Sequence, residues 1–202
     1  PTGQLWSRQY LEALLKRYKL VICDEAFLPL VPQGEKESLI SLVANNSNLV
    51  VIRSLTKVFG VAGLRLGYAI ASPERIYRWS NWRDPWPVNG LAIAAGSSLM
   101  SDASGMQTWI NRVQNWVSIE GAWLQKTLSN IPGINPYPSA ANFLLIKGDF
   151  PLLDLREKLV MRKILLRDCR SFPRLGEHWL RIGFQNRVGN RRIANAIREL
   201  LR

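Results

Sequence analysis

Two short apolar runs, each ending in polar residues, constrain the fold of this chain more than any other feature. The first covers residues 21–23 and ends at Asp24, and the second covers 49–52 and leads into residues 53–57. Neither run alternates apolar with polar residues, which is typical of strands buried on both faces of a sheet. A segment with helical spacing, residues 4–18, precedes the first run, and a third apolar run covers 67–71. This order predicts an α/β domain with a largely parallel sheet.

The rest of the chain predicts a second, smaller domain. From residue 73 onward the pattern is helical, and residues 106–130 have the apolar stripe of one long amphipathic helix. Prolines and a glycine then interrupt the chain between residues 132 and 138. We expect the following elements after them: a strand over 142–147, a helix over 151–163, strands over 164–167 and 179–184, and a helix over 190–201. The predicted division is a partial large cofactor-binding domain, 1–104, followed by the connecting helix and a small α+β domain, 105–202.

Composition excludes several classes of protein. The 202 residues include 27 Lys and Arg against 15 Asp and Glu, but the basic residues are scattered singly, which favours a solvated or partner-facing surface over a nucleic-acid site. No apolar run reaches the roughly 18 residues of a membrane helix. Two cysteines and one histidine favour a reducing compartment and argue against a His-rich metal site. We therefore expect a cytoplasmic protein with no metal, no nucleic-acid partner and no membrane contact.

Chemically useful side chains follow the first two predicted strands. Asp24 ends the first strand, Ser54 and Lys57 follow the second, and Arg65 lies eight residues beyond Lys57. Ligands of open α/β sheets bind beyond the carboxyl ends of the strands, so an acid and a lysine there can meet in one cleft. Taken singly, a strand-end aspartate is more often a turn residue and a lysine is more often solvated. The joint spacing favours a functional cleft.

These segments resemble the motifs of class I and II aminotransferase-type enzymes, which use pyridoxal 5′-phosphate. Residues 54–57 with 63–68 are similar to the family's cofactor-lysine segment, and residues 24–27 are similar to its acidic motif for the pyridine ring. Pro1-Thr2-Gly3 resembles the end of an Asn-Pro-x-Asn-Pro-Thr-Gly segment, and Arg181 matches an arginine that grips a substrate carboxylate. The motifs occur in family order over essentially the whole chain.

The resemblance implies a role for each of five residues. Lys57 would bond to the cofactor aldehyde, and Asp24 would pair with the pyridine nitrogen and keep it protonated. Ser54 and Arg65 would hold the cofactor phosphate, the arginine through two parallel hydrogen bonds. Arg181 would orient the substrate carboxylate in the same way. The resemblance also implies a homodimer that acts on a small phosphorylated amino acid.

Two further segments lean toward one branch of this family. Residues 84–92 and 164–172 resemble stretches of the L-threonine-O-3-phosphate decarboxylases of cobalamin biosynthesis, which form aminopropanol phosphate. Arg167 in the second stretch is a candidate ligand for the substrate phosphate, its alternative being a solvated strand-end arginine. Phe27 stands where many transaminases of the group have a tyrosine. A histidinol-phosphate-type aminotransferase and a non-catalytic relative are the alternatives.

Some of the family's motifs do not occur in the chain. Its enzymes are longer, and we find neither their Gly-rich phosphate loop nor the aromatic residue that stacks on the cofactor ring. We therefore expect the 202 residues to be a C-terminal portion of a longer enzyme or the product of a truncated reading frame. The isolated chain is expected to have little or no activity.

Overall fold

A computed structural model describes residues 1–201, which form two compact units. The N-terminal unit is Trp6–Gln114, and the C-terminal unit combines Pro1–Leu5 with Asn115–Arg202. The division therefore falls inside helix α5 (Ala103–Ser129), whereas the sequence analysis placed it at residue 104. Among the described residues, no helix combines the length and the apolar character needed to cross a membrane.

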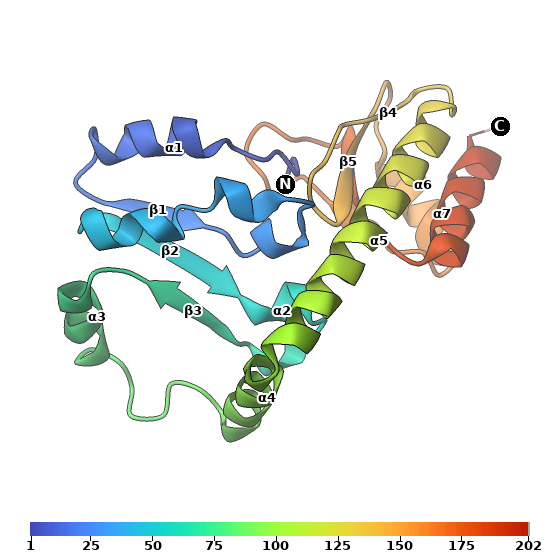
Figure 1. Cartoon of the computed structure of the whole chain (residues 1–202). Helices are drawn as coiled ribbons and strands as arrows, with labels where there is room; N and C mark the ends of the chain where they lie inside the picture. Colours follow the sequence, from blue (N-terminus) through green and yellow to red (C-terminus); the bar gives the residue numbers. More distant parts are fainter. Residues whose placement is uncertain (202) are drawn as a thin grey trace. The chain divides into compact units, whose positions relative to one another are not determined.

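The sheet of the N-terminal unit has the order β1-β2-β3 (Figure 1). Its strands are β1 (Val21–Asp24), β2 (Leu49–Ser54) and β3 (Gly67–Ile70), which confirms the three predicted strands. β1 and β2 are parallel, but β3 runs antiparallel to β2, a departure from the predicted largely parallel sheet. The reason is the connection: only the short helices α2 (Leu55–Val58) and η4 (Ala62–Leu64) separate β2 from β3, too little for a crossover.

The two faces of this sheet differ in burial. Helix α1 (Arg8–Leu15), shorter than the predicted 4–18, and the 3-10 helix η3 (Ile40–Asn45) pack on one face. The core there contains Leu39, Val43, Leu49 and Val51, with Leu11 and Leu15 of α1 against it. On the other face Ile22 and Ile52 are 56% and 38% exposed. Because side chains alternate along a strand, Asp24 and Ser54 belong to this open face, and Glu25 and Arg53 turn toward the covered one.

Short helices complete the N-terminal unit. They are η1 (Leu28–Leu30), η2 (Gly34–Glu37), α3 (Pro73–Ser80) and α4 (Gly90–Ser101). Ser72 and Asn89 cap α3 and α4, because their side-chain oxygens accept hydrogen bonds from the backbone N–H groups of Arg75 and Ala92. The helical pattern predicted from residue 73 is confirmed.

The C-terminal unit contains an antiparallel sheet of order β4-β5-β7-β6. The strands are β4 (Ile134–Pro136), β5 (Phe143–Gly148), β6 (Arg167–Asp168) and β7 (Trp179–Gly183). Its helices are α6 (Leu153–Met161), α7 (Arg187–Leu200) and the second part of α5. Buried leucines and isoleucines of these strands and helices, among them Leu124, Leu144, Leu159, Leu180 and Ile197, supply the core.

Two predicted boundaries in this unit are wrong. The predicted strand 164–167 is replaced by β6, because the residues before Arg167 terminate α6: the Ile164 N–H donates to the Leu159 carbonyl at 2.9 Å. The last helix begins at Arg187 rather than residue 190, because Asn186 caps it through the Gly189 N–H. β4 was not predicted, since its three residues lie in the proline-rich break.

Candidate cofactor and substrate sites

Asp24 lies at the carboxyl end of β1, beside the end of β2. The two strands are parallel and Asp24 pairs with Ile52 in the ladder. The Asp24 side chain is exposed, and its Oδ1 accepts a hydrogen bond from the Ala26 N–H at 2.9 Å. Within residues 1–201, no Lys, Arg or His nitrogen lies within 4.0 Å of this carboxylate. Asp24 therefore offers a negative charge that no cation among the described residues neutralises.

Ser54 and Lys57 lie on the turn that follows β2. Ser54 is the N-cap of α2: its Oγ accepts from the Thr56 N–H and lies 2.7 Å from the Thr56 Oγ1. The Lys57 Nζ donates to the same Thr56 hydroxyl at 3.3 Å, and no carboxylate of the described residues pairs with it. Two hydroxyls and an amine are thus gathered in a single helical turn.

Phe27 connects the two strand ends. The Lys57 Nζ lies 5.5 Å from the centre of the Phe27 ring, so the segment after Asp24 reaches the lysine. This contact supports the predicted meeting of the acid and the lysine at the carboxyl edge of the sheet. The ring carries no hydroxyl, so the hydrogen bond that a tyrosine would offer here is missing.

Arg65 occupies a strained backbone position in the loop beside α2. Its φ of 53° and ψ of 46° are left-handed, a conformation that costs a side chain with a Cβ about 1–2 kcal/mol. The Arg65 side chain is exposed and donates to the Ala62 carbonyl at 3.0 Å. The loop is tied to α2 by the Leu55 N–H, which donates to the Leu66 carbonyl. Phosphate binding stays the predicted role of Arg65.

Arg167 and Arg181 are direct partners across two strands of the C-terminal unit. They face each other in the β6–β7 ladder, and Arg181 lies 4.6 Å from the Phe143 ring centre. Arg167 lies 5.8 Å from the ring centre of Phe172 and donates to the Ser171 Oγ at 3.3 Å. In the described part of the chain, neither guanidinium has a carboxylate within 4.0 Å. Two like charges at opposed positions repel, and a bound anion would relieve that repulsion.

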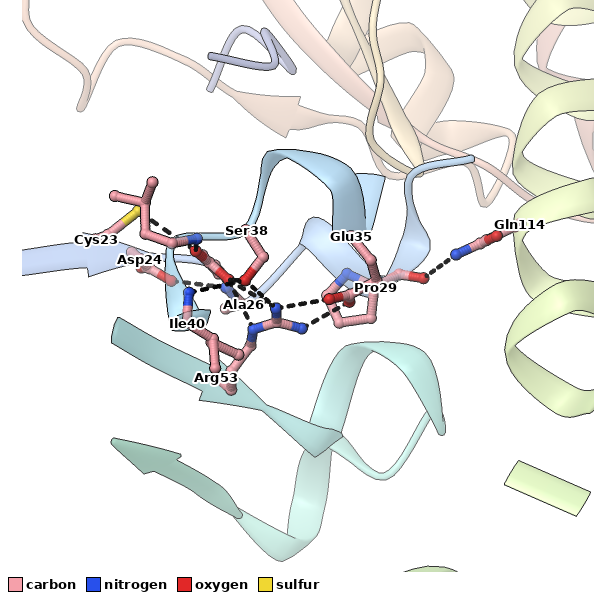
Figure 2. Close-up of polar contacts among 11 residues, drawn as sticks. Cys23, Asp24, Ala26, Pro29, Glu35, Ser38, Ile40, Arg53 and Gln114 are labelled. Carbon is pink, nitrogen blue, oxygen red and sulfur yellow. Dashed lines mark hydrogen bonds and ion pairs between the residues drawn. The ribbon is translucent and has the colours of Figure 1, made fainter. Parts of the chain in front are cut away.

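Behind the strand ends lies a group of charged side chains that the sequence analysis did not single out. We call Glu25, Glu35, Ser38 and Arg53 the buried charge cluster (Figure 2). A sequence signal for it existed, because Arg53 has the same parity along β2 as the buried Leu49 and Val51. A charged residue at an inward position calls for a buried partner of opposite charge.

Arg53 in the buried charge cluster and the neighbouring Cys23 both have shifted pKa values. Burial lowers the pKa of Arg53, but the hydrogen bonds and charges of Glu35 and Glu25 outweigh it and hold that pKa above its ordinary value. Burial, followed by the negative charges of Glu25 and Asp24, raises the pKa of the Cys23 thiol to about 11. Cys23 is thus a protonated, weakly reactive thiol at neutral pH.

Comparison with known proteins places these motifs in a family. Residues 1–198 match the family described as aminotransferase class I and II. The chain belongs to the class I and II aminotransferase family. Its cofactor is pyridoxal 5′-phosphate, as in the family's decarboxylases and aminotransferases. Both the predicted α/β fold and the predicted cofactor are confirmed.

Relatives of two kinds are similar to this aminotransferase-family chain. Threonine-phosphate decarboxylase of Salmonella typhimurium is 34% identical over all of the chain and 55% of its own length. Histidinol-phosphate aminotransferase of Symbiobacterium thermophilum is 32% identical over all of the chain and 54% of its own length. The crystal structure of the histidinol-phosphate aminotransferase from Clostridium acetobutylicum superposes with a TM-score of 0.90 at 25% identity, covering 100% of this chain and 61% of that one. The chain thus spans about half the length of the curated relatives it matches.

The residues at the strand ends fit this family's cofactor. The pyridine nitrogen needs an anionic partner, and Asp24 is an exposed carboxylate with no ion pair among the described residues. The aldehyde needs an amine, and Lys57 supplies one next to the hydroxyls of Ser54 and Thr56. The phosphate needs donors, which those hydroxyls and the Arg65 guanidinium offer. Within residues 1–201, no cluster of His, Cys, Asp and Glu suits a metal ion.

Proposed function

We propose that the protein containing this chain decarboxylates L-threonine O-3-phosphate with pyridoxal 5′-phosphate, as a step of cobalamin biosynthesis. The observation that carries the proposal is the opposed pair Arg167 and Arg181, which lacks any carboxylate partner in the described chain. A substrate with both a phosphate and a carboxylate matches two adjacent guanidinium groups. The 34% identity to a threonine-phosphate decarboxylase supports the same substrate.

The N-terminal unit would hold the cofactor. When bound, pyridoxal phosphate supplies a protonated pyridine ring that accepts an electron pair from the substrate carbon. Asp24 would accept the hydrogen bond of the ring N–H and so keep that nitrogen protonated. Lys57 would anchor the cofactor at its aldehyde carbon, and Ser54 and Arg65 would hold its phosphate group.

The C-terminal unit would hold the substrate. Arg181 would grip the carboxylate and Arg167 the phosphate, and in the proposed reaction the bond between Cα and the carboxylate would break. Its electron pair stays with Cα, CO2 leaves, and a proton takes its place at Cα. Lys57 in its ammonium form is the candidate donor of that proton. The net change is uptake of one proton and release of one CO2, which leaves aminopropanol phosphate.

A histidinol-phosphate-type aminotransferase is the second candidate, favoured by the 32% identity to such an enzyme. In that reaction Lys57 would instead remove the proton from Cα and no CO2 would form. Histidinol phosphate has a phosphate but no carboxylate, so the arginine pair would have to serve it and a keto-acid partner in turn. Homodimerisation and a cytoplasmic location, implied by the resemblance to the family, complete the proposal.

Parallel assays of the complete protein test the reaction. With L-threonine O-3-phosphate and no keto acid, we expect CO2 and aminopropanol phosphate in equal amounts. Formation of glutamate from histidinol phosphate and 2-oxoglutarate, without CO2 from L-threonine O-3-phosphate, would show that the protein is an aminotransferase and not a decarboxylase. If the protein shows neither activity and does not bind the cofactor, it is a non-catalytic relative of these enzymes.

Substitution of the lysine tests the cofactor role separately. We expect Lys57→Ala to abolish the visible absorbance of lysine-bound cofactor, and the exposed Lys36, which bonds only to Gln33, gives the matched control Lys36→Ala. Absorbance that survives unchanged in Lys57→Ala would show that another group binds the cofactor.

A further inference from the structure

The buried charge cluster contains an ion pair shielded from water. The Arg53 NH2 lies 2.7 Å from the Glu25 Oε2, and the two side chains are 5% and 4% exposed. The same guanidinium makes two parallel hydrogen bonds to Glu35, at 2.7 and 2.8 Å, and the Glu35 side chain is 53% exposed. Figure 2 shows the Arg53 side chain extending from β2 toward Ser38 and Glu35. One arginine therefore neutralises a buried carboxylate and draws in a second from the surface.

The remaining polar atoms of the pair are also satisfied. The Glu25 Oε1 accepts from the Leu39 N–H at 2.8 Å, and its Oε2 accepts from the Ser38 hydroxyl and the Arg53 Nε. The Ser38 oxygen in turn accepts from the Arg53 NH2 at 2.9 Å. A buried ion pair is tolerated only when its geometry is good and further hydrogen bonds complete it, and both conditions hold here. Such a network has a single well-defined geometry.

The pair lies directly beside the candidate cofactor residues in sequence. Glu25 follows Asp24, and Arg53 precedes Ser54. Because side chains alternate across a strand, Glu25 and Arg53 lie on the covered face of the sheet, and Asp24 and Ser54 lie on the opposite face. The last ladder hydrogen bond here runs from the Glu25 N–H to the Ile52 carbonyl, at 2.8 Å. Beyond it, no ladder hydrogen bond of the described residues joins the two strands, and the Glu25–Arg53 pair is what continues the connection.

We infer that the Glu25–Arg53 pair is a positioning clasp, which sets the spacing of the β1 and β2 ends and thereby places Asp24 relative to Ser54 and Lys57. β1 has four residues, so its ladder with β2 is short and ends at Asp24. The ring nitrogen and the phosphate of one rigid cofactor must be met from two different strands. A fixed spacing of the strand ends serves that requirement directly. The inference rests on the cofactor roles proposed above for Asp24 and Lys57.

Glu35 has a lesser part in this clasp. Its side chain is half-exposed and comes from η2, which is not a strand of the sheet. Removing its charge leaves Glu25 and Arg53 paired. We therefore expect Glu35→Gln to leave cofactor binding close to that of the parent protein.

The test uses the complete protein loaded with pyridoxal phosphate. Arg53→Lys keeps the positive charge but replaces the Nε and NH2 donors that hold the Glu25 Oε2 with a single ammonium, so the clasp loosens without an unpaired buried carboxylate. We expect the cofactor to dissociate about tenfold faster, and the pH midpoint of its visible absorbance to shift, since misplacement of about 1 Å is costly at a preorganised site. Arg8→Lys is the matched control, because Arg8 pairs with Glu12 on the surface of α1 in the same unit.

A double variant separates positioning from stability. Glu25→Gln with Arg53→Met removes both buried charges and keeps an acceptor for the Leu39 N–H, so the fold is expected to regain most of the stability that Arg53→Met alone loses. If the pair is a positioning clasp, cofactor release should stay fast in this double variant even though its stability is restored. Recovery of both stability and parent-like cofactor release would overturn the inference, because the pair would then only stabilise the fold.

The absorbance of Lys57→Ala distinguishes this failure from a failure of the proposed cofactor site. If Lys57→Ala loses the band while Arg53→Lys leaves the dissociation rate and pH midpoint unchanged, the cofactor site stands and the clasp is wrong. If Lys57→Ala keeps the band, the cofactor roles are wrong and the inference fails with them. Loss of the band in Lys57→Ala with fast release and a shifted midpoint in Arg53→Lys supports both.

Discussion

Arg53 and Arg181 occupy similar places and have opposite surroundings. Each lies on an inner strand of its sheet, Arg53 on β2 between β1 and β3, and Arg181 on β7 between β5 and β6. Arg53 is buried and paired with two carboxylates, whereas Arg181 rests on the Phe143 ring with no carboxylate within 4.0 Å among residues 1–201. The first guanidinium is used by the fold, whereas a ligand role for the second stays a proposal. The partners of an arginine, rather than its position in a sheet, indicate what it does.

From this comparison we expect replacement of Arg53 and replacement of Arg181 to impair different properties of the protein. Loss of Arg53 should appear first as lost stability, and loss of Arg181 as lost substrate binding. The neighbours of each residue supply finer tests.

Arg53→Met is expected to cause the largest loss. It leaves the Glu25 carboxylate buried without its cation, which typically costs about 3–5 kcal/mol of unfolding free energy. Chemical denaturation of the complete protein measures this loss. The surface variant Arg8→Met should cost less than about 1 kcal/mol, since exposed pairs contribute little. Equal losses in the two variants would show that burial of the Arg53 pair is unimportant.

Arg181→Gln should spare the fold and damage catalysis. With no carboxylate partner to orphan, we expect the unfolding free energy to stay within about 0.5 kcal/mol of the parent. Loss of a forked hydrogen bond to the substrate carboxylate should lower kcat/KM about 100-fold, or roughly 3 kcal/mol. Arg170→Gln is the control, since Arg170 is already paired with Asp168 on the surface. A stability loss in Arg181→Gln as large as that in Arg53→Met would remove the distinction between the two arginines.

Glu120 tests whether the C-terminal unit also contains a charge used by the fold. Its side chain is buried on α5 and accepts hydrogen bonds from Arg187 and Asn190. Burial raises the pKa of Glu120, but these hydrogen bonds and the charges of Arg187 and Arg191 outweigh it and hold the pKa below its ordinary value. A carboxyl group whose pKa is lower in the folded state stabilises the folded protein fully at pH values above its unfolded-state pKa, about 4.3. That stabilisation is lost as the pH falls through the folded-state pKa.

We therefore expect the protein to lose stability on acidification below about pH 5, and Glu120→Gln to lose less over the same range. Denaturant titrations repeated at several pH values measure the two slopes. Identical slopes for parent and variant would show that Glu120 has no altered pKa in the folded protein.

Cys23 gives the smallest and most local readout. Its Sγ lies 3.9 Å from the Glu25 Oε1, and its pKa of about 11 keeps it protonated at pH 8. In a Cys169→Ser background, Glu25→Gln should increase the rate of Cys23 alkylation by less than about tenfold, because burial, the largest cause of the raised pKa, remains. An unchanged rate would mean that the Glu25 charge does not reach the thiol.

The sequence predicted well what depends on local pattern. Both apolar runs are strands, and Asp24, Ser54 and Lys57 lie at the strand ends where the parallel pairing was expected to bring them. A continuous apolar run has few alternatives to a buried strand, and the carboxyl ends of parallel strands share one edge. The long helix over residues 106–130 was predicted for the same kind of reason, its apolar period.

Features that depend on pairing between distant segments were missed. The antiparallel direction of β3 follows from the shape of the loop at residues 55–66, and the opposition of Arg167 to Arg181 follows from the register of a two-residue strand. Neither register has a signature in a single segment. The buried charge cluster joins Glu25, which follows β1, with Glu35 of η2 and Arg53 of β2, and its only sequence signal was the inward parity of Arg53.

The left-handed backbone at Arg65 affects which substitutions at this position would stabilise the protein. Glycine or asparagine would fit that backbone better than arginine does. A library of variants selected only for thermal stability should therefore enrich Arg65→Gly. We expect the selected variants to bind the cofactor phosphate more weakly. Given the phosphate-binding role proposed for Arg65, selection for loop stability and selection for cofactor binding would favour different residues at position 65.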